Sequence, residues 1–278
     1  YDKAITLHPE NASSYYTGKG TTQRTMRKPE AAIENYTRAI LLNPKNDHAY
    51  LGKATALVDL KKYQEALDCY NTSIELNPKN VSAYRSKAIT LRGLKRFDEA
   101  LECYDNAIKM NPHGAGTYHN GKAITLRNLQ RYDDAVKAYQ EALKYNPNCD
   151  STHNGQGNAY YHLEKYDEAL QCYQRAMELN PGNDRARANM GRVLHAMGRE
   201  DEAQLYGYQS SASRLDTEDG FSDSDFRHDF GNQTFLTDTE RSRIEDKGSL
   251  KIDFSVSGSE SEREGARRES PRRDFRKE

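Results

Sequence analysis

The stretch "VSAYRSKAITLRGLKRFDEALECYDNAIKMNP", residues 81–112, decides the fold. In its first half Tyr84, Ala88 and Leu91 fall at helical spacing, and the apolar residues from Phe97 onward do the same in its second half. Between the halves, "GLKR" supplies a glycine and basic residues that suit a helix end, and "DEA" puts carboxylates in the next first turn. The stretch therefore predicts two helices joined by a tight turn.

The same pattern returns along the chain at intervals marked by proline. From Pro44 onward an alanine stands twelve residues before each of these prolines, and a tyrosine stands eight residues before it. A period near 34 residues with small and aromatic residues at fixed offsets is typical of a solenoid, because one helix pair cannot cover its own apolar face. The prolines recur 34 or 35 residues apart: Pro9, Pro44, Pro78, Pro112, Pro147 and Pro181.

Two of these intervals are one residue longer than the others. The hexapeptide "KAITLR" occurs at residues 87–92 and again at residues 122–127, which is 35 residues later. Lys87 lies nine residues after the preceding proline, whereas Lys122 lies ten residues after its own. The segment "PHGAGTYHNGK" before Lys122 contains three glycines. The extra residue therefore lies either in the turn between the helix pairs or in the following helix, and the glycines favour the turn.

Through these positions the chain resembles the tetratricopeptide repeat family over roughly residues 1–206. The resemblance implies an all-α fold, a right-handed superhelix of paired helices. We expect residues 1–12 to be the end of a truncated repeat, residues 13–183 to form five repeats, and residues 184–206 to form a divergent C-terminal capping repeat.

The chain departs from the family pattern at one position of the first helix, where a leucine is usual. A long aliphatic stem can cover apolar surface while its polar head stays in water, so the fold prediction stands. The residues at this position are Lys19, Lys53, Lys87, Lys122 and Gln156.

Residues 207–278 lose the periodicity and are rich in Ser, Asp, Glu, Arg and Gly. Such a segment cannot bury enough apolar area to offset the entropy of ordering it, so we expect a disordered charged tail. Its stretch Asp216–Phe230 is acidic with interleaved phenylalanines, whereas "REGARRESPRRDFRK" is basic. The tail is either a plain solvated linker or a regulatory segment. Its candidate phosphorylation sites are Ser222, Ser257, Ser259 and Ser270.

Composition and cysteine usage bear on the compartment. The chain has 278 residues, a formal net charge of −1, 35% hydrophobic residues and a mean hydropathy of −1.03. It contains no apolar run of membrane-spanning length and no signal-peptide pattern. Three of its four cysteines recur at one place in the repeat, which favours free thiols over a disulfide framework. We expect a cytoplasmic protein, with the nucleus as the alternative. Because the sequence begins with Tyr1, we expect it to be part of a longer chain.

The sequence contains no constellation typical of catalysis, metal binding or cofactor binding. It has no metalloprotease, dinucleotide-binding or P-loop motif and no CxxC pair, so we expect no enzyme activity, no cofactor and no metal. Before Gly207 it holds 28 basic and 25 acidic residues, which does not predict a specific nucleic-acid surface. We also expect no membrane partner.

In the family that the chain resembles, the first helices line a concave groove that holds a partner peptide or helix. Asparagine amides can pair with a peptide backbone and arginine forks suit carboxylates. The alternative for each residue is an ordinary solvated helix face. The groove candidates are Arg85, Arg92, Asn120, Arg127, Asn154, Asn158, Tyr161, Arg185, Asn189 and Arg192.

Two specialisations of the family are not supported. The clamp by which chaperone-binding members hold a terminal carboxylate is incomplete. The asparagine ladder of O-linked N-acetylglucosamine transferases is matched by Asn189 alone, because the other rungs are Gly52, Ser86, Gly121 and Gly155.

The resemblance thus implies a non-enzymatic scaffold or adaptor that binds a protein or peptide in its groove. The alternative is the regulatory or substrate-recruiting region of a larger enzyme, for example a transferase. The groove candidates lean basic, so we also expect intramolecular docking of the acidic stretch Asp216–Phe230, which the tether would favour through a high effective concentration.

Overall fold

The computed structural model describes residues 1–208, all of which lie in the first of the two units into which the chain divides, Tyr1–Phe235. The expected disorder of the tail and its four candidate phosphorylation sites lie outside the described residues. Within residues 1–208 the chain forms helices and no strand. The helices are α1 (Asp2–Leu7), α2 (Ala12–Thr25), α3 (Pro29–Leu42), α4 (Asp47–Asp59), α5 (Tyr63–Leu76), α6 (Val81–Gly93), α7 (Phe97–Met110), α8 (Ala115–Asn128), α9 (Tyr132–Tyr145), α10 (Asp150–His162), α11 (Tyr166–Leu179), α12 (Asp184–Ala196) and α13 (Glu200–Leu205).

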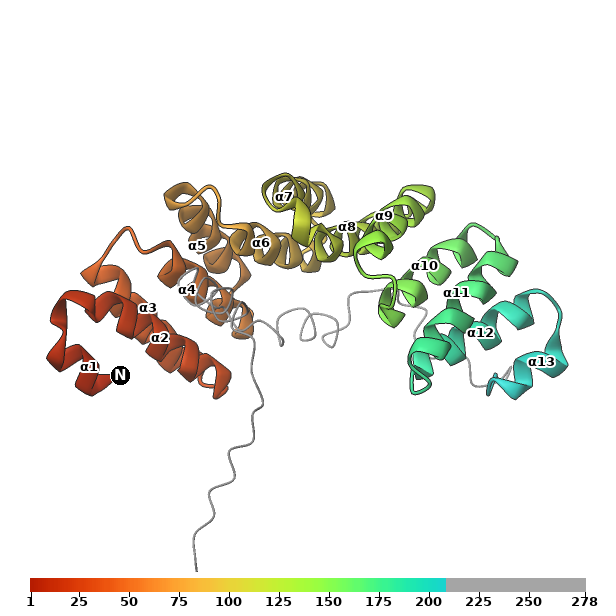
Figure 1. Cartoon of the computed structure of the whole chain (residues 1–278), viewed down its shortest axis with the longest axis horizontal. Helices are drawn as coiled ribbons and strands as arrows, with labels where there is room; N and C mark the ends of the chain where they lie inside the picture. The colour runs from red at the N-terminus through yellow and green to blue at the C-terminus, as the bar shows by residue number, and fades with distance from the viewer. Residues whose placement is uncertain (209–278) are drawn as a thin grey trace, which may run out of the picture. The chain divides into compact units, whose positions relative to one another are not determined.

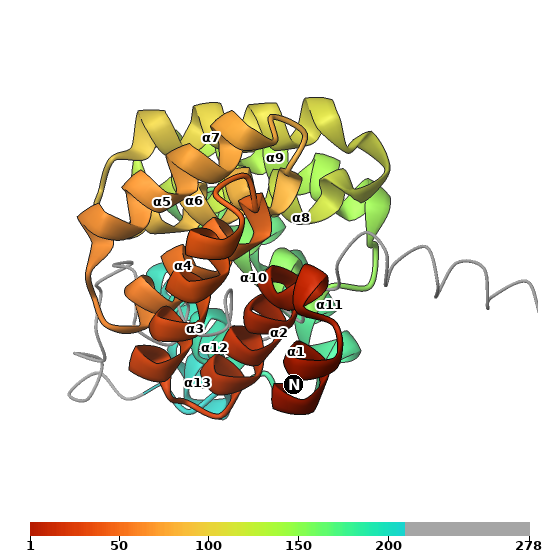
Figure 2. The same ribbon diagram turned by 90° about the vertical axis from the view of Figure 1, so that its left-hand side faces the viewer.

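From α2 onward the helices form antiparallel pairs that follow one another in chain order (Figure 1). The two helices of each pair contact each other, and each second helix also contacts the first helix of the next pair. The first helices α2, α4, α6, α8, α10 and α12 contact one another in succession. In Figure 2, too, successive pairs lie side by side. The predicted all-α solenoid is confirmed.

The core of each pair is built from the alanine and the tyrosine that the sequence period places at fixed offsets. Ala100 of α7 is fully buried, and Tyr104, one helical turn later, is 1% exposed. The small alanine lets two backbones approach closely, and the tyrosine ring fills the space beside it. The same two positions are buried in the four other complete pairs, as Ala32 and Tyr36, Ala66 and Tyr70, Ala135 and Tyr139, and Ala169 and Tyr173.

The extra residue of each long interval lies in the first helix that follows the turn, which corrects the prediction. Helices α2 and α8 have 14 residues each, whereas α4, α6, α10 and α12 have 13, and each of the six begins three residues after its proline. A short 3₁₀ helix follows each of the two prolines that begin a 35-residue interval, at Pro9–Asn11 and at Pro112–Gly114. At the second site the side chain of Asn111 accepts a hydrogen bond from Gly114 N at 3.0 Å. The turn thus takes a 3₁₀ form at the same length, and the first helix of the pair is one residue longer than its counterparts.

The turn inside each pair depends on a left-handed residue, which is not a glycine in the five complete pairs. Gly93 is the last residue of α6, and the left-handed residue is Lys95, with φ of 59°. Lys95 N donates to Arg92 O at 3.0 Å and Arg96 N donates to Leu91 O at 2.9 Å, which satisfies the last carbonyl groups of the helix. The equivalent left-handed residues of the other pairs are Arg27, Lys61, Gln130, Glu164 and Gly198.

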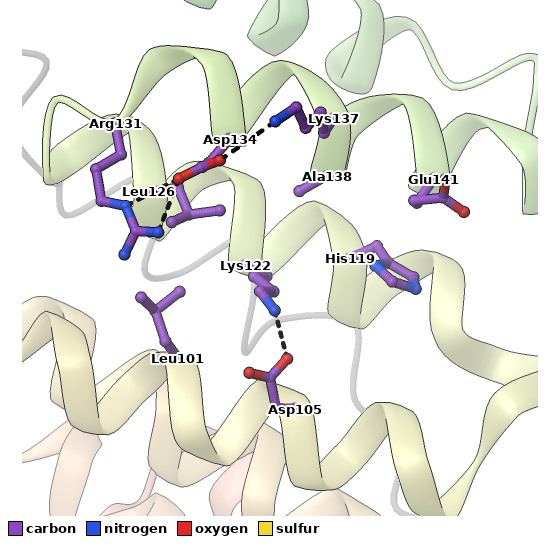
Figure 3. A pocket seen from close by; sticks show the side chains of 10 residues that line it. All are labelled: Leu101, Asp105, His119, Lys122, Leu126, Arg131, Asp134, Lys137, Ala138 and Glu141. Atoms are coloured by element: carbon purple, nitrogen blue, oxygen red, sulfur yellow. Dashed lines mark hydrogen bonds and ion pairs between the residues drawn. The ribbon is translucent and has the colours of Figure 1, made fainter.

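Two of the four lysines at the position where the family usually has leucine form an ion pair with the preceding second helix. Lys122 Nζ lies 2.5 Å from Asp105 Oδ1 of α7 (Figure 3), and Lys19 Nζ lies 2.6 Å from Asp2 Oδ1 of α1. The lysine side chains are 27–28% exposed, so their stems are largely covered. At these two lysines the aliphatic part of the side chain is packed, and the ammonium group forms an ion pair with the preceding helix.

Candidate functional site

Polar side chains gather on the face along which α8, α10 and α12 contact one another. We call the seven side chains listed at the end of this paragraph the first-helix face. On α10 they are spaced by four and three residues, and on α12 by three, so that each helix presents them on one side. None of the seven is fully buried. They are Asn120, Arg127, Asn154, Asn158, Tyr161, Asn189 and Arg192.

Three asparagines of this face form one hydrogen-bonded network across two helices. Asn189 Nδ2 of α12 donates to Asn154 Oδ1 at 3.0 Å and to Asn158 Oδ1 at 2.9 Å, both of α10. Asn158 Oδ1 also accepts from Tyr173 Oη of α11 at 2.7 Å. Because both oxygens are engaged inside the network, the amide N–H groups of Asn154 and Asn158 are turned away from it.

Arg192 extends the network at its C-terminal end. Its Nη1 donates to Asn189 Oδ1 at 3.3 Å, and its Cζ lies 5.1 Å from the centroid of the Tyr161 ring. A guanidinium over a tyrosine ring is attracted by the negative face of the ring. The stacking holds Arg192 on the face and leaves further N–H donors for a ligand.

On α8 the face continues with Asn120 and Arg127. Asn120 Oδ1 accepts from Thr152 Oγ1 of α10 at 3.3 Å, which links the two first helices. Arg127 is half-buried, and its Nε is buried without a hydrogen-bond acceptor among the described residues. A buried donor without an acceptor costs about 1–3 kcal/mol. The Nε atom itself is covered, so a ligand would meet the exposed part of the Arg127 side chain.

Arg92 is a correction to the groove candidates. It is 1% exposed, and its Nη1 donates to the hydroxyl of Tyr104 at 3.2 Å. The guanidinium bends toward the polar end of the buried tyrosine of its own pair and is covered there. Arg92 therefore does not present its guanidinium to solvent. Arg85 is half-buried and Arg185 is exposed, and the structure does not bring either of them into the asparagine network.

Sequence reasoning missed two members of the site, Tyr173 and Thr152. Tyr173 was interpreted as a core residue, and it is 1% exposed. Its hydroxyl nevertheless reaches Asn158, just as the hydroxyl of Tyr36 lies 3.1 Å from Thr21 Oγ1 in the first pair. The recurrence of a tyrosine, and not a phenylalanine, at this position was the available signal.

The same tyrosines explain why the asparagine ladder is missing. A Cβ atom at Gly121 would lie 2.5 Å from Cε1 of Tyr104, and one at Gly155 would lie 2.7 Å from the hydroxyl of Tyr139. Each ring belongs to the preceding second helix and fills the place of the absent side chain. A larger residue could not enter without moving the ring, so asparagine is excluded from these two rungs.

A cleft of about 390 Å³ lies apart from the asparagine network, between α7 and the pair α8 and α9 (Figure 3). Its charged residues are largely engaged with one another: Asp105 pairs with Lys122, and Asp134 pairs with Arg131 at 2.7 Å. Burial lowers the pKa of His119 at its edge. Paired charges of this kind stabilise the packing and do not offer a reactive group.

The cysteine side chains do not form a reactive thiolate site either. The four cysteines are free, as predicted. Burial raises the pKa of Cys103 to about 11 and that of Cys172 to about 12, so both remain protonated thiols at neutral pH. Within residues 1–208 no cluster of His, Cys, Asp and Glu is arranged to hold a metal ion. In the same residues no helix has the length and apolar character to cross a membrane.

Models of the tetratricopeptide repeat match the sequence at residues 13–46, 48–80, 81–113, 120–184 and 172–205. A search of curated proteins finds no match. Together the repeat models cover most of the chain that the structure describes.

Several solved structures have a similar fold, and the three described next align with this chain over nearly their whole length. YrrB, described as a TPR protein with an unusual peptide-binding site, is 21% identical with a TM-score of 0.56, covering 71% of this chain and 97% of its own. PilF of Pseudomonas aeruginosa is 15% identical with a TM-score of 0.63, covering 86% and 98%. MamA of Desulfovibrio magneticus RS-1 is 17% identical with a TM-score of 0.57, covering 62% and 97%. At these identities the likeness is one of fold.

Proposed function

Because the chain belongs to the tetratricopeptide repeat family, whose arrays are typical of non-catalytic scaffolds, we propose that it is an adaptor that binds a partner peptide on its first-helix face. The partner is a protein segment in extended or helical form. The adaptor works without a cofactor and without a reaction of its own, in the cytoplasm or the nucleus.

The observation that carries the proposal is the asparagine network of α10 and α12. Within the described residues, Asn154 and Asn158 use their amide oxygens as acceptors and make no hydrogen bond through their N–H groups. A peptide backbone offers carbonyl oxygens as acceptors. Since Tyr173 and Asn189 already hold the amides in place, a peptide would meet donors that lose little entropy on binding.

The similar structures give independent support of a limited kind. YrrB is described as having a peptide-binding site, and its helix array covers much of this chain. An array of this architecture can therefore hold a peptide. The substrate-recruiting region of a larger enzyme would use the same face in the same way, so the binding experiment below applies to both functions.

The experiment selects peptides from a random display library on the full chain and measures their affinity by fluorescence anisotropy. We expect the N158A/N189A double variant to bind the selected peptides at least ten-fold more weakly than the unchanged chain. The variant loses the Asn158 amide, which would donate to the peptide, and Asn189, which holds the Asn154 amide in place. A cost of about 1 kcal/mol for each accounts for such a factor.

Asn71→Ala is the matched control, because Asn71 is an exposed asparagine on the second helix α5. It should bind as the unchanged chain does. If the selected peptides bind all three chains equally, the first-helix face is not the binding site and the proposal fails.

A further inference from the structure

Charge is divided between the two helices of each pair. From α6 to α12 the first helices contain eight Lys or Arg and two Asp, and α6 and α8 contain no acidic residue at all. From α7 to α13 the second helices contain thirteen Asp or Glu and four Lys or Arg. The array that is nearly neutral as a whole thus has a basic first-helix side, which attracts an acidic ligand.

The two aspartates of these first helices do not neutralise the positive charge of the first-helix face. Asp150 begins α10, and its Oδ2 accepts from Asn180 at 2.8 Å and from Asn183 at 3.0 Å. Asp184 begins α12 and pairs with Arg187 at 3.0 Å. Arg127 and Arg192, in contrast, have no carboxylate partner among the described residues, and the Nε of Arg127 is buried without an acceptor.

The described part of the chain ends beside this site. The ring of Tyr208 stacks on His195 of α12 with centroids 4.5 Å apart, and Tyr208 N donates to Ala203 O at 3.2 Å. His195 lies three residues after Arg192, which is about one helical turn. After α13 the chain therefore returns to α12, next to the C-terminal end of the first-helix face.

The segment that follows has the complementary charge. Residues 215–230, "LDTEDGFSDSDFRHDF", contain six acidic residues and one arginine. Asp216 comes eight residues after Tyr208, a reach of up to about 26 Å for an extended chain at ~3.3 Å per residue. A tether of this length sets an effective concentration on the order of millimolar, which an external ligand has to exceed.

From these observations we infer that residues 215–230 occupy the first-helix face of their own chain, with carboxylates on Arg127 and Arg192. The inference rests on the proposed function and adds its regulation: a partner binds by displacing the acidic segment. The adaptor is then inhibited by its own C-terminal region until a competing peptide or a change in that segment releases the face.

The test compares three full-length chains with one probe, a fluorescein-labelled peptide of residues 215–230. In the first variant the six acidic residues of this segment are changed to their amides: Asp216, Glu218, Asp219, Asp223, Asp225 and Asp229. In the matched control six later acidic residues are changed in the same way: Asp238, Glu240, Glu245, Asp246, Asp253 and Glu260. The basic C-terminal stretch is present in all three chains, so its attraction for the probe is a constant background.

We expect the first variant to bind the probe about ten-fold more tightly than the unchanged chain, and the control to bind as the unchanged chain does. Adding R127A and R192A to the first variant should abolish the gain. Equal affinity in all three chains, or a gain that survives loss of the two arginines, would overturn the inference.

The peptides selected by display separate the two possible failures. If they require Asn158 and Asn189 but bind the unchanged chain and the first variant equally, the face binds peptides and the self-inhibition is wrong. If they do not require the two asparagines, the proposed function itself is wrong.

Discussion

The ring of Tyr104 lies where a side chain on Gly121 would have to be: a Cβ atom there would come within 2.5 Å of Tyr104 Cε1. Tyr104 belongs to α7 and Gly121 to the first helix of the next pair. The contact therefore fixes how closely successive pairs approach. It also leaves the first-helix face without a side chain at this position.

Gly121→Ala should destabilise the array, because the added methyl group must push the tyrosine ring or the helix away. Overpacking of this kind costs about 1–3 kcal/mol. Urea unfolding followed by circular dichroism measures the loss. Gly182→Ala is the control, since a Cβ atom there lies 3.5 Å from its nearest neighbour and should be tolerated. Equal stability of the two variants would contradict this account of the contact.

Tyr173→Phe removes the hydroxyl that donates to Asn158 Oδ1 at 2.7 Å and keeps the ring. We expect a loss of about 1 kcal/mol in the free energy of unfolding. A double-mutant cycle with Asn158→Ala tests the pairing, and we expect a coupling of similar size. If the two effects simply add, the hydroxyl and the amide do not interact in solution.

Asp47 makes the stability of the array depend on acid. Burial by itself would raise its pKa, but His48, with Nδ1 at 3.5 Å, and the hydrogen bonds from Asn77 and Asn80 outweigh burial and lower the pKa to about 2. The folded pKa lies below the unfolded value of about 4, so the contribution is present above pH ~4 and is lost as pH falls to about 2. It amounts to no more than about 2 kcal/mol, since Asp47 remains partly exposed.

Urea unfolding of the unchanged chain and of Asp47→Asn at several pH values measures this contribution. The difference in stability should be largest at pH 5 and should shrink toward pH 2. Asp98→Asn, which removes an exposed carboxylate, controls for the loss of one charge. A difference that stays constant from pH 5 to pH 2 would refute the assignment.

Lys95→Gly should stabilise the array, because Lys95 holds a left-handed backbone with φ of 59°. A residue with a Cβ atom is strained there by about 1 kcal/mol, which glycine avoids, although the flexibility of glycine in the unfolded chain returns part of the gain. Glu102→Gly, at an exposed position in the middle of α7, should have the opposite effect and lower stability by about 1 kcal/mol. Thermal unfolding distinguishes the two signs.

The sequence was sufficient to predict the fold because the same residue types recur at the same positions in each repeat. Ala100 and Tyr104 recur at fixed offsets, and proline marks the end of each pair. The extra residue near Gly114 could be detected because the neighbouring repeats supplied the reference length, but its place in α8 and not in the turn could not be derived from the glycines. Repetition thus turns weak local signals into a strong one.

The site was harder to predict because position on a helix does not determine burial. Arg92 and Arg127 occur in the same hexapeptide, yet Arg92 is buried on the hydroxyl of Tyr104 while Arg127 is half-buried on the face. The difference depends on contacts between helices, which spacing along one helix does not encode. For the same reason the pairing of Asn189 with α10 could not be derived from the sequence.

Photo-crosslinking of a peptide selected by display locates the binding surface most directly. A benzoylphenylalanine replaces either Tyr161, on the first-helix face, or Tyr145, which is 48% exposed on the second helix α9. The account predicts that the peptide crosslinks at position 161 and not at position 145. Crosslinking at position 145 with none at position 161 would contradict the claim that the first-helix face binds the partner.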